Sequence, residues 1–116
     1  MTAGTHDITI EIGATFELTA IYQINDVAQD ITGWDARMQV RKRQKSTTAI
    51  LDWDVVGGQI SVDGSNGKVI ISVDAVEAGN TDIPLYGVYD LEIESPAGKV
   101  IRLLQGDVNF SGEVTR

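Results

Sequence analysis

Cysteine is absent from this chain of 116 residues, and histidine occurs only once, as His6. Without cysteine there are no disulfide bonds and no thiolate ligands for a metal ion. His6 precedes the first apolar segment, which is a poor place for the rigidly oriented imidazole of a catalytic triad. The sequence therefore predicts no cofactor, no metal centre and no enzymatic activity.

Long apolar runs are missing as well. No segment approaches the roughly 18 consecutive apolar residues that span a bilayer. The opening MTAGTHDITI lacks the basic region and the apolar stretch of a signal peptide. These two absences predict a protein without a membrane segment.

Positive charge is scarce but concentrated. The net charge of −8 makes general nucleic-acid binding unfavourable, since phosphate backbones attract basic proteins. Yet five of the nine basic residues occur in the stretch ARMQVRKRQKS: Arg37, Arg41, Lys42, Arg43 and Lys45. One interpretation is the polar face of a strand and the following turn, where lysine discourages pairing with another chain. The other is a docking patch for an acidic partner, and an assembly protein could use both.

Alternation of apolar and polar residues dominates the pattern and is typical of half-buried strands. The clearest examples are DITIEI, FELTAIYQI, WDARMQV, KVIISV and YDLEIE. Turn-forming pairs such as Asn-Gly and Pro-Ala-Gly separate them. The pattern predicts one all-β domain over 1–116, an antiparallel β-sandwich of about eight strands, immunoglobulin-like or related. A single short helix near 74–80 is the most that is expected, with an arm at 1–7 and a tail at 111–116.

Rows of carboxylates are candidates for chemistry or for solvated strand faces. Asp52 and Asp54 flank Trp53, and a second acidic row covers 90–94. We interpret both rows as outward faces, with Arg37 and Arg41 as cross-strand partners. Arg102 is expected to pair with an acid of the second row across the last hairpin.

Two further residue groups keep alternatives open. The loop DGSNG at 63–67 predicts a hairpin turn, with a calcium site as the alternative, because calcium prefers carboxylate and carbonyl oxygens. Trp34 alternates with apolar residues and is expected in the core. Trp53 is the best candidate for the exposed aromatic platform that a carbohydrate-binding module would need.

Two segments carry a family resemblance: ITGWDARMQVRKR at 31–43 and YDLEIESPAGKVIRLLQGDVNFSGEVTR at 89–116. With the opening ITIEIGATFELT, they resemble a group of small proteins from tailed bacteriophages and prophages. Members share I-T-G-aromatic-x-A-R-M-Q-V-R and, later, Y-D-L-E-I-x-S-x-x-G-x-V-x-R-L-L-x-G-x-V. One departure is the ending Ser-Gly-Glu-Val, where the group has Ser-Pro-Glu-Val, and glycine loosens this exit.

The resemblance implies a virion structural protein with no catalytic residues. Its expected role is a tail, baseplate or fibre adaptor in the virion, assembled in the host cytoplasm. Expected partners are other phage structural proteins and further copies of the chain, arranged symmetrically. The basic run, the arm and the tail are the expected contacts. Alternatives are a head decoration or head–tail joining protein, or a carbohydrate- or receptor-binding module.

Overall fold

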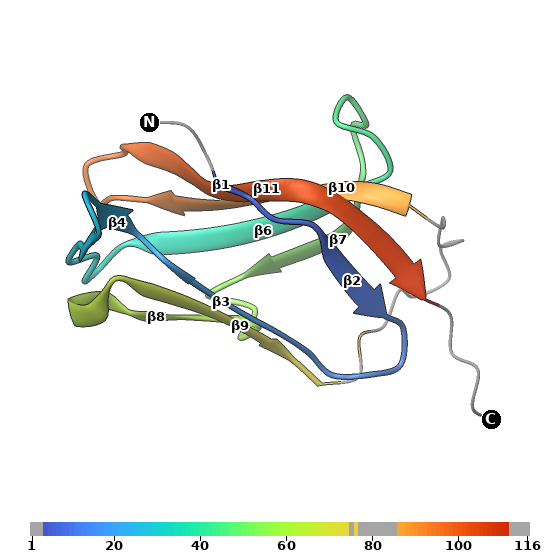
Figure 1. Cartoon of the computed structure of the whole chain (residues 1–116), viewed down its shortest axis with the longest axis horizontal. Coiled ribbons are helices and arrows are strands. Elements are labelled where there is room, and N and C mark those ends of the chain that lie inside the picture. The colour runs from blue at the N-terminus through green and yellow to red at the C-terminus, as the bar shows by residue number, and fades with distance from the viewer. Residues whose placement is uncertain (1–3, 75, 77–85, 112–116) are drawn as a thin grey trace.

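The computed structural model describes residues 4–74, 76 and 86–111, and β-strands account for nearly all regular structure there (Figure 1). A single 3-10 turn, η1, completes the regular elements of these ranges. The elements are β1 (Gly4–Thr5), β2 (Ile8–Glu11), β3 (Phe16–Ile21), β4 (Gln23–Ile24), β5 (Val27–Ala28), β6 (Asp35–Arg41), β7 (Ala49–Asp54), β8 (Ile60–Asp63), η1 (Gly64–Asn66), β9 (Lys68–Val73), β10 (Tyr86–Glu94) and β11 (Val100–Ser111).

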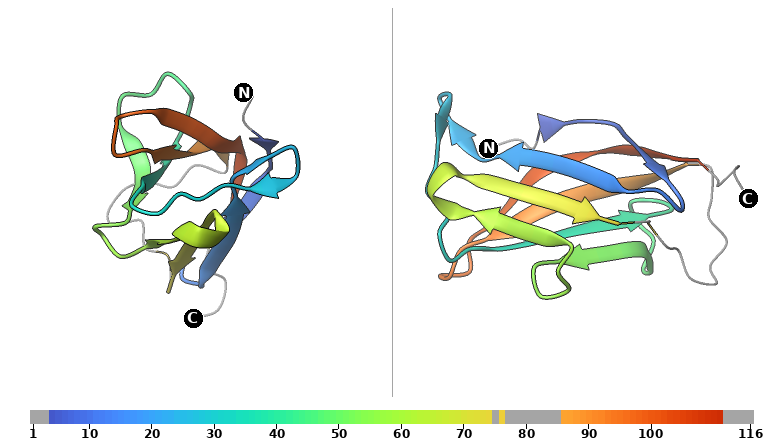
Figure 2. Two further views of the ribbon diagram at one scale, coloured as in Figure 1. Left: turned by 90° about the vertical axis from the view of Figure 1, so that its left-hand side faces the viewer. Right: turned by 90° about the horizontal axis from the view of Figure 1, so that it is seen from below.

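Two sheets face each other across the core (Figure 2). The larger has the order β1-β11-β10-β6-β7, with β2 also beside β11, and the smaller has the order β3-β9-β8. Strands β4 and β5 form a separate small hairpin. Both sheets contribute alternate residues to one core, as in β-sandwiches generally. The all-β sandwich predicted from the alternation is therefore confirmed.

Burial follows the alternation of the sequence. In β10, Tyr89, Leu91 and Ile93 are buried, while the acidic residues between them are only partly buried. The same alternation gives β6 one core face and one outer face, whereas both residues of β1 are exposed. Phe16 of the smaller sheet and Trp53 of the larger sheet place their ring centroids 5.6 Å apart, so this aromatic contact joins the two layers.

The N-terminal segment departs from a purely antiparallel arrangement. Strands β1 and β2 both run parallel to β11, with Ile8 opposite Val108. Parallel pairing is possible because β2 leads across to β3 in the other sheet and makes no hairpin with β11. The expected arm at 1–7 is thus partly strand, from Gly4 onward.

Most expected turns are found, while two expectations fall on residues that are not described. Gly33 and Gly98 have positive φ at the turns before β6 and between β10 and β11. The 63–67 loop forms η1 and closes the hairpin of β8 and β9. The short helix near 74–80 and the tail at 111–116 lie almost entirely outside the described residues. Ile24, the last residue of the alternating segment FELTAIYQI, is exposed; it lies in the β4–β5 hairpin, which pairs with neither main sheet.

Candidate functional site

The outer face of the larger sheet carries rows of polar side chains that run across the strands. The register places Arg37 of β6 between Asp54 of β7 and Glu92 of β10, and Glu92 lies opposite Arg102 of β11. Positive and negative residues therefore alternate along this row. Directly opposed side chains on one sheet face are close enough to interact, and opposite charges stabilise such pairs.

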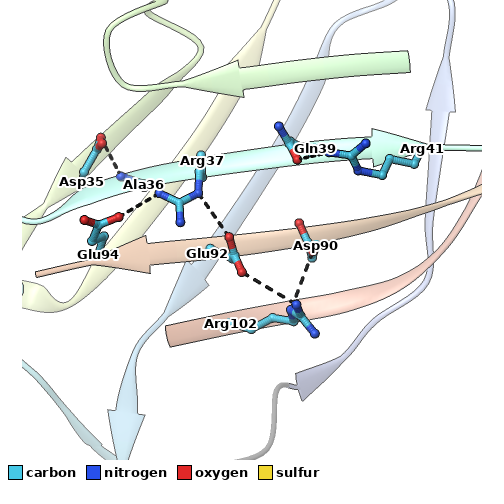
Figure 3. A network of polar contacts seen from close by, with 9 residues as sticks. All are labelled: Asp35, Ala36, Arg37, Gln39, Arg41, Asp90, Glu92, Glu94 and Arg102. Carbon is cyan, nitrogen blue, oxygen red and sulfur yellow. Dashed lines mark hydrogen bonds and ion pairs between the residues drawn. The ribbon is translucent and has the colours of Figure 1, made fainter. Parts of the chain in front are cut away.

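Ion pairs follow this register (Figure 3). Arg37 donates from Nε to Glu92 Oε1 at 3.1 Å and from Nη1 to Glu94 Oε1 at 3.0 Å. Arg102 makes longer contacts, 3.7 Å to Asp90 Oδ2 and 3.8 Å to Glu92 Oε2. The predicted pairing of Arg37 and Arg102 with the acidic row is confirmed. The hydrogen bond to Glu94 raises the pKa of Arg37 from its usual value, so Arg37 stays protonated. Glu92 and Glu94 balance its positive charge.

Arg41 lies in a different environment, although it belongs to the same strand. Its register neighbours are Ala49 on β7 and Val88 on β10, which carry no charge. Its guanidinium donates instead to the Ser46 carbonyl at 2.8 Å and to Gln39 Oε1 at 2.6 Å. Within the part of the chain that the structure describes, Arg41 forms no ion pair. The prediction that Arg41 pairs with an acid is therefore wrong, because the register brings it beside valine.

The other three basic residues of the run at 37–45 lie in the loop between β6 and β7, which projects from the larger sheet (Figure 1). Lys42, Arg43 and Lys45 are exposed there. The loop is ordered by a turn in which Ser46 N–H donates to the Arg43 carbonyl at 3.0 Å, and Arg43 N–H donates to Ser46 Oγ at 3.1 Å. Together with the Arg41 bond to Ser46, these contacts hold three cations on one ordered projection.

A hollow of about 310 Å³ lies on the outer face beside this loop. Its walls come from β1, β6, β10, β11 and the loop. They are formed by Thr5, Gln39, Arg41, Gln44, Val88, Tyr89, Asp90, Arg102, Gln105, Gly106 and Asp107. A neighbouring hollow shares Val88 and Asp107 and adds Lys42 and Tyr86. Three glutamines line the first hollow: Gln39, Gln44 and Gln105. They were not identified from the sequence, because only the fold brings them together.

Asp90 of β10 lies on this face between β6 and β11. Burial raises its pKa, and the nearby Glu92 adds to the rise, while Arg102, Arg41 and Arg37 oppose it. Its negative charge is therefore less favourable here than in water. Its contact with Arg102 at 3.7 Å does not offset this effect. Burial and the charge of Glu92 therefore outweigh the nearby arginines in their effect on the pKa of Asp90.

The N-terminal segment pairs with β11 at the edge of the larger sheet. His6 N–H donates to the Gln105 carbonyl at 2.9 Å, and the Asp107 N–H donates to Asp7 Oδ1 at 3.0 Å. The buried Tyr89 hydroxyl donates to the His6 carbonyl. These bonds hold Thr5 at the edge of the hollow. His6 thus contributes backbone hydrogen bonds at this edge.

Tyr89 makes folding sensitive to alkaline pH. Burial, assisted by the charge of Asp7, raises its pKa from 10 to about 12. A raised pKa contributes stability that is complete below pH 10 and is lost as the pH rises through about 12, here about 2–3 kcal/mol. Chemical denaturation across this range should show that Tyr89→Phe lacks this loss. Tyr86→Phe, at an exposed tyrosine, should retain it, and an identical pH profile for all three proteins would refute this role.

Trp53 does not form the exposed platform expected of a sugar site. Its side chain is 5% exposed and packs on Phe16. As the alternation predicts, Trp53 lies on the opposite face of β7 from Asp52 and Asp54. The face that carries Trp53 is the one that packs on the core. Trp34, expected inside, is half-buried and contacts Tyr22, with ring centroids 6.1 Å apart. The prediction that Trp53 could contact a glycan is therefore wrong, because its side chain is part of the core.

Comparisons with known proteins leave the family resemblance as an expectation. Models of known protein families include none that matches the chain, and no curated protein matches it. Over residues 4–74, 76 and 86–111, no helix is long and apolar enough to cross a membrane. In these same ranges no three histidine or carboxylate side chains are grouped to hold a metal ion. The described residues thus define a β-sandwich with one charged, hollowed sheet face.

Proposed function

We propose that this protein is a non-enzymatic structural component of a tailed-phage particle, a tail, baseplate or fibre adaptor that docks other virion proteins. The observation that carries the proposal is the ordered loop with Lys42, Arg43 and Lys45, exposed on an otherwise acidic protein. A compact cluster of one charge sign attracts a partner surface of the opposite sign and orients it.

The phage-like motifs support this proposal through the face that they build. The segment at 31–43 supplies β6, and the segment at 89–116 supplies most of β10 and all of β11, which are adjacent strands. Their shared polar positions include Arg37, Glu92 and Arg102, the members of the ion-pair row. The residues that carry the resemblance thus specify one sheet face, next to which the basic loop projects.

Fractionation of particles tests the proposal directly. Particles of the phage that encodes this chain would be separated into heads and tails, and each fraction would be searched for the chain by mass spectrometry. Presence with tails supports the adaptor role. Presence with heads supports the alternative of head decoration or head–tail joining. Absence from both fractions would overturn the proposal of a virion protein.

Charge reversal on the loop should impair assembly without unfolding the domain. We expect Lys42→Glu with Lys45→Glu to lower incorporation into particles by roughly tenfold or more, since like charges then meet across the interface. The control is Lys68→Glu with Lys99→Glu, which makes the same change of composition away from the loop. Thermal unfolding of both variants separates docking from stability. Normal incorporation of the loop variant would exclude the loop as the docking surface.

A further inference from the structure

We infer that the hollow on the outer face binds a carboxylate from an acidic segment of the docking partner, held between Arg41 and Arg102. This inference rests on the proposed function, because it names the partner chemistry for the same face. This inference differs from docking on the loop alone, since it places a side chain of the partner in the hollow on the sheet, next to the basic loop.

Arg41 supplies the first half of the site. Its guanidinium is oriented by two neutral acceptors, the Ser46 carbonyl and Gln39 Oε1. Arginine has five N–H donors in a planar fork, and a carboxylate can accept two of them side by side. Val88 occupies the opposing position on β10, and Asp90, two residues further along, lines the same hollow. Among the described residues, Asp90 forms an ion pair with Arg102 and none with Arg41, so Arg41 keeps donors for an external carboxylate.

Arg102 supplies the second half. It lines the same hollow, and its side chain is 45% exposed. Its contacts with Asp90 and Glu92 are 3.7 and 3.8 Å, longer than the usual charge-assisted hydrogen bond of about 2.8 Å. Arg102 therefore retains donors for a further acceptor, whereas Arg37 has two short contacts with carboxylates.

The surroundings favour an anion over a cation. Gln44 lines the hollow, so its chain neighbours Arg43 and Lys45 lie at the border, and Lys42 lines the adjoining hollow. Two acids, Asp90 and Asp107, also line the first hollow. A third acid, Asp7, lines the adjoining hollow together with Lys42. The five basic residues of the walls, the border and the adjoining hollow outnumber these three acids, and the glutamine side chains add neutral donors. An acidic peptide segment fits this charge distribution.

The test is an NMR titration of the intact chain with two capped synthetic peptides. One alternates glutamate with threonine, and the other alternates glutamine with threonine. We expect the glutamate peptide to shift the amide signals of Gln39, Arg41 and Gln105, and the glutamine peptide to leave them in place. A glutamate peptide that shifts only signals of the loop 42–48 would overturn the hollow while leaving loop docking intact.

Val88→Glu supplies a competing carboxylate within the chain, beside Arg41. It should weaken binding of the glutamate peptide by roughly tenfold to a hundredfold, the worth of a charge-assisted hydrogen bond. The control Val88→Gln introduces a side chain of nearly the same size as glutamate but without its charge. It should bind the glutamate peptide as the wild type does. Arg102→Gln should weaken binding by a similar factor, and dispersed NMR spectra establish that each variant is folded.

These variants separate the two proposals. Equal binding by Val88→Glu and Val88→Gln would show that Arg41 takes no part and would overturn the inference. Failure of every protein to bind the glutamate peptide would overturn it as well. Neither result would touch the virion role, which particle fractionation tests independently. The double variant Lys42→Glu with Lys45→Glu should bind the glutamate peptide more weakly, while the amide shifts that the peptide causes stay centred on the hollow.

Discussion

Trp53→Ala is expected to destabilise the domain by about 3–5 kcal/mol, the range for removal of a large buried aromatic side chain. The indole is 5% exposed, and its contact with Phe16 joins the two sheets. Truncation would leave a cavity between the layers and remove the aromatic contact. Small domains have a total stability of about 5–15 kcal/mol, so this single change removes a large part of it. Urea unfolding followed by circular dichroism measures the loss.

A matched control distinguishes this structural role from a surface role. Trp53→Phe retains an aromatic ring in the core and should lose less stability than the alanine variant. Val56→Ala, at a residue that is 95% exposed in the following turn, should change the free energy of unfolding by less than about 0.5 kcal/mol. A Trp53→Ala protein with wild-type stability would contradict the buried position of this residue.

Gly106→Ala should release the N-terminal segment from β11. A Cβ atom at this position would clash with the carbonyl oxygen of His6 and would lie 2.8 Å from the carbonyl carbon, both backbone atoms. The segment would have to move, and the hydrogen bonds from Tyr89 and to Gln105 would be lost or weakened. Overpacking and the loss of these bonds together predict destabilisation of about 2–4 kcal/mol.

Hydrogen exchange locates this effect. In the Gly106→Ala protein, the amides of 4–11 should exchange faster, while those of β6 and β10 retain more of their protection. Gly4→Ala is the control, because its Cβ would meet the flexible side chain of Leu104 at 3.2 Å and needs only a small adjustment. Unchanged protection of 4–11 in Gly106→Ala would mean that the close approach at His6 is unimportant.

The alternating pattern was sufficient to predict the longer strands and most of the core, but not the two-residue strands β1 and β5. Leu91 and Ile93 are fully buried, and Glu92 lies on the outer face, as the period of two requires. The pairing of Arg37 with this acidic row could be predicted for the same reason. Such predictions use only neighbours along one strand and the general rule that one face of a strand is buried.

The candidate site depends on contacts that no local pattern contains. Arg41 lies beside Val88 because of long-range strand pairing, and the ladder to β7 has an irregularity next to it, between Val40 and Arg41. The parallel course of β1 and β2 is likewise a matter of topology. The position of Trp53 was predictable, since its alternation with the outward Asp52 and Asp54 places it on the inner face, and the glycan hypothesis for Trp53 disagreed with this pattern.

The pairing of β2 with β11 also affects how the chain folds during synthesis. Asp7 and Asp107 are joined by a hydrogen bond across a separation of 100 residues. Ile8 and Ile10 therefore leave the ribosome long before the strand that shelters them, and both are buried in the finished domain. Contacts so distant in the chain form slowly, because a long loop must close first. The larger sheet can be completed only after β11 has emerged, and until then the nascent chain exposes an apolar strand to other proteins.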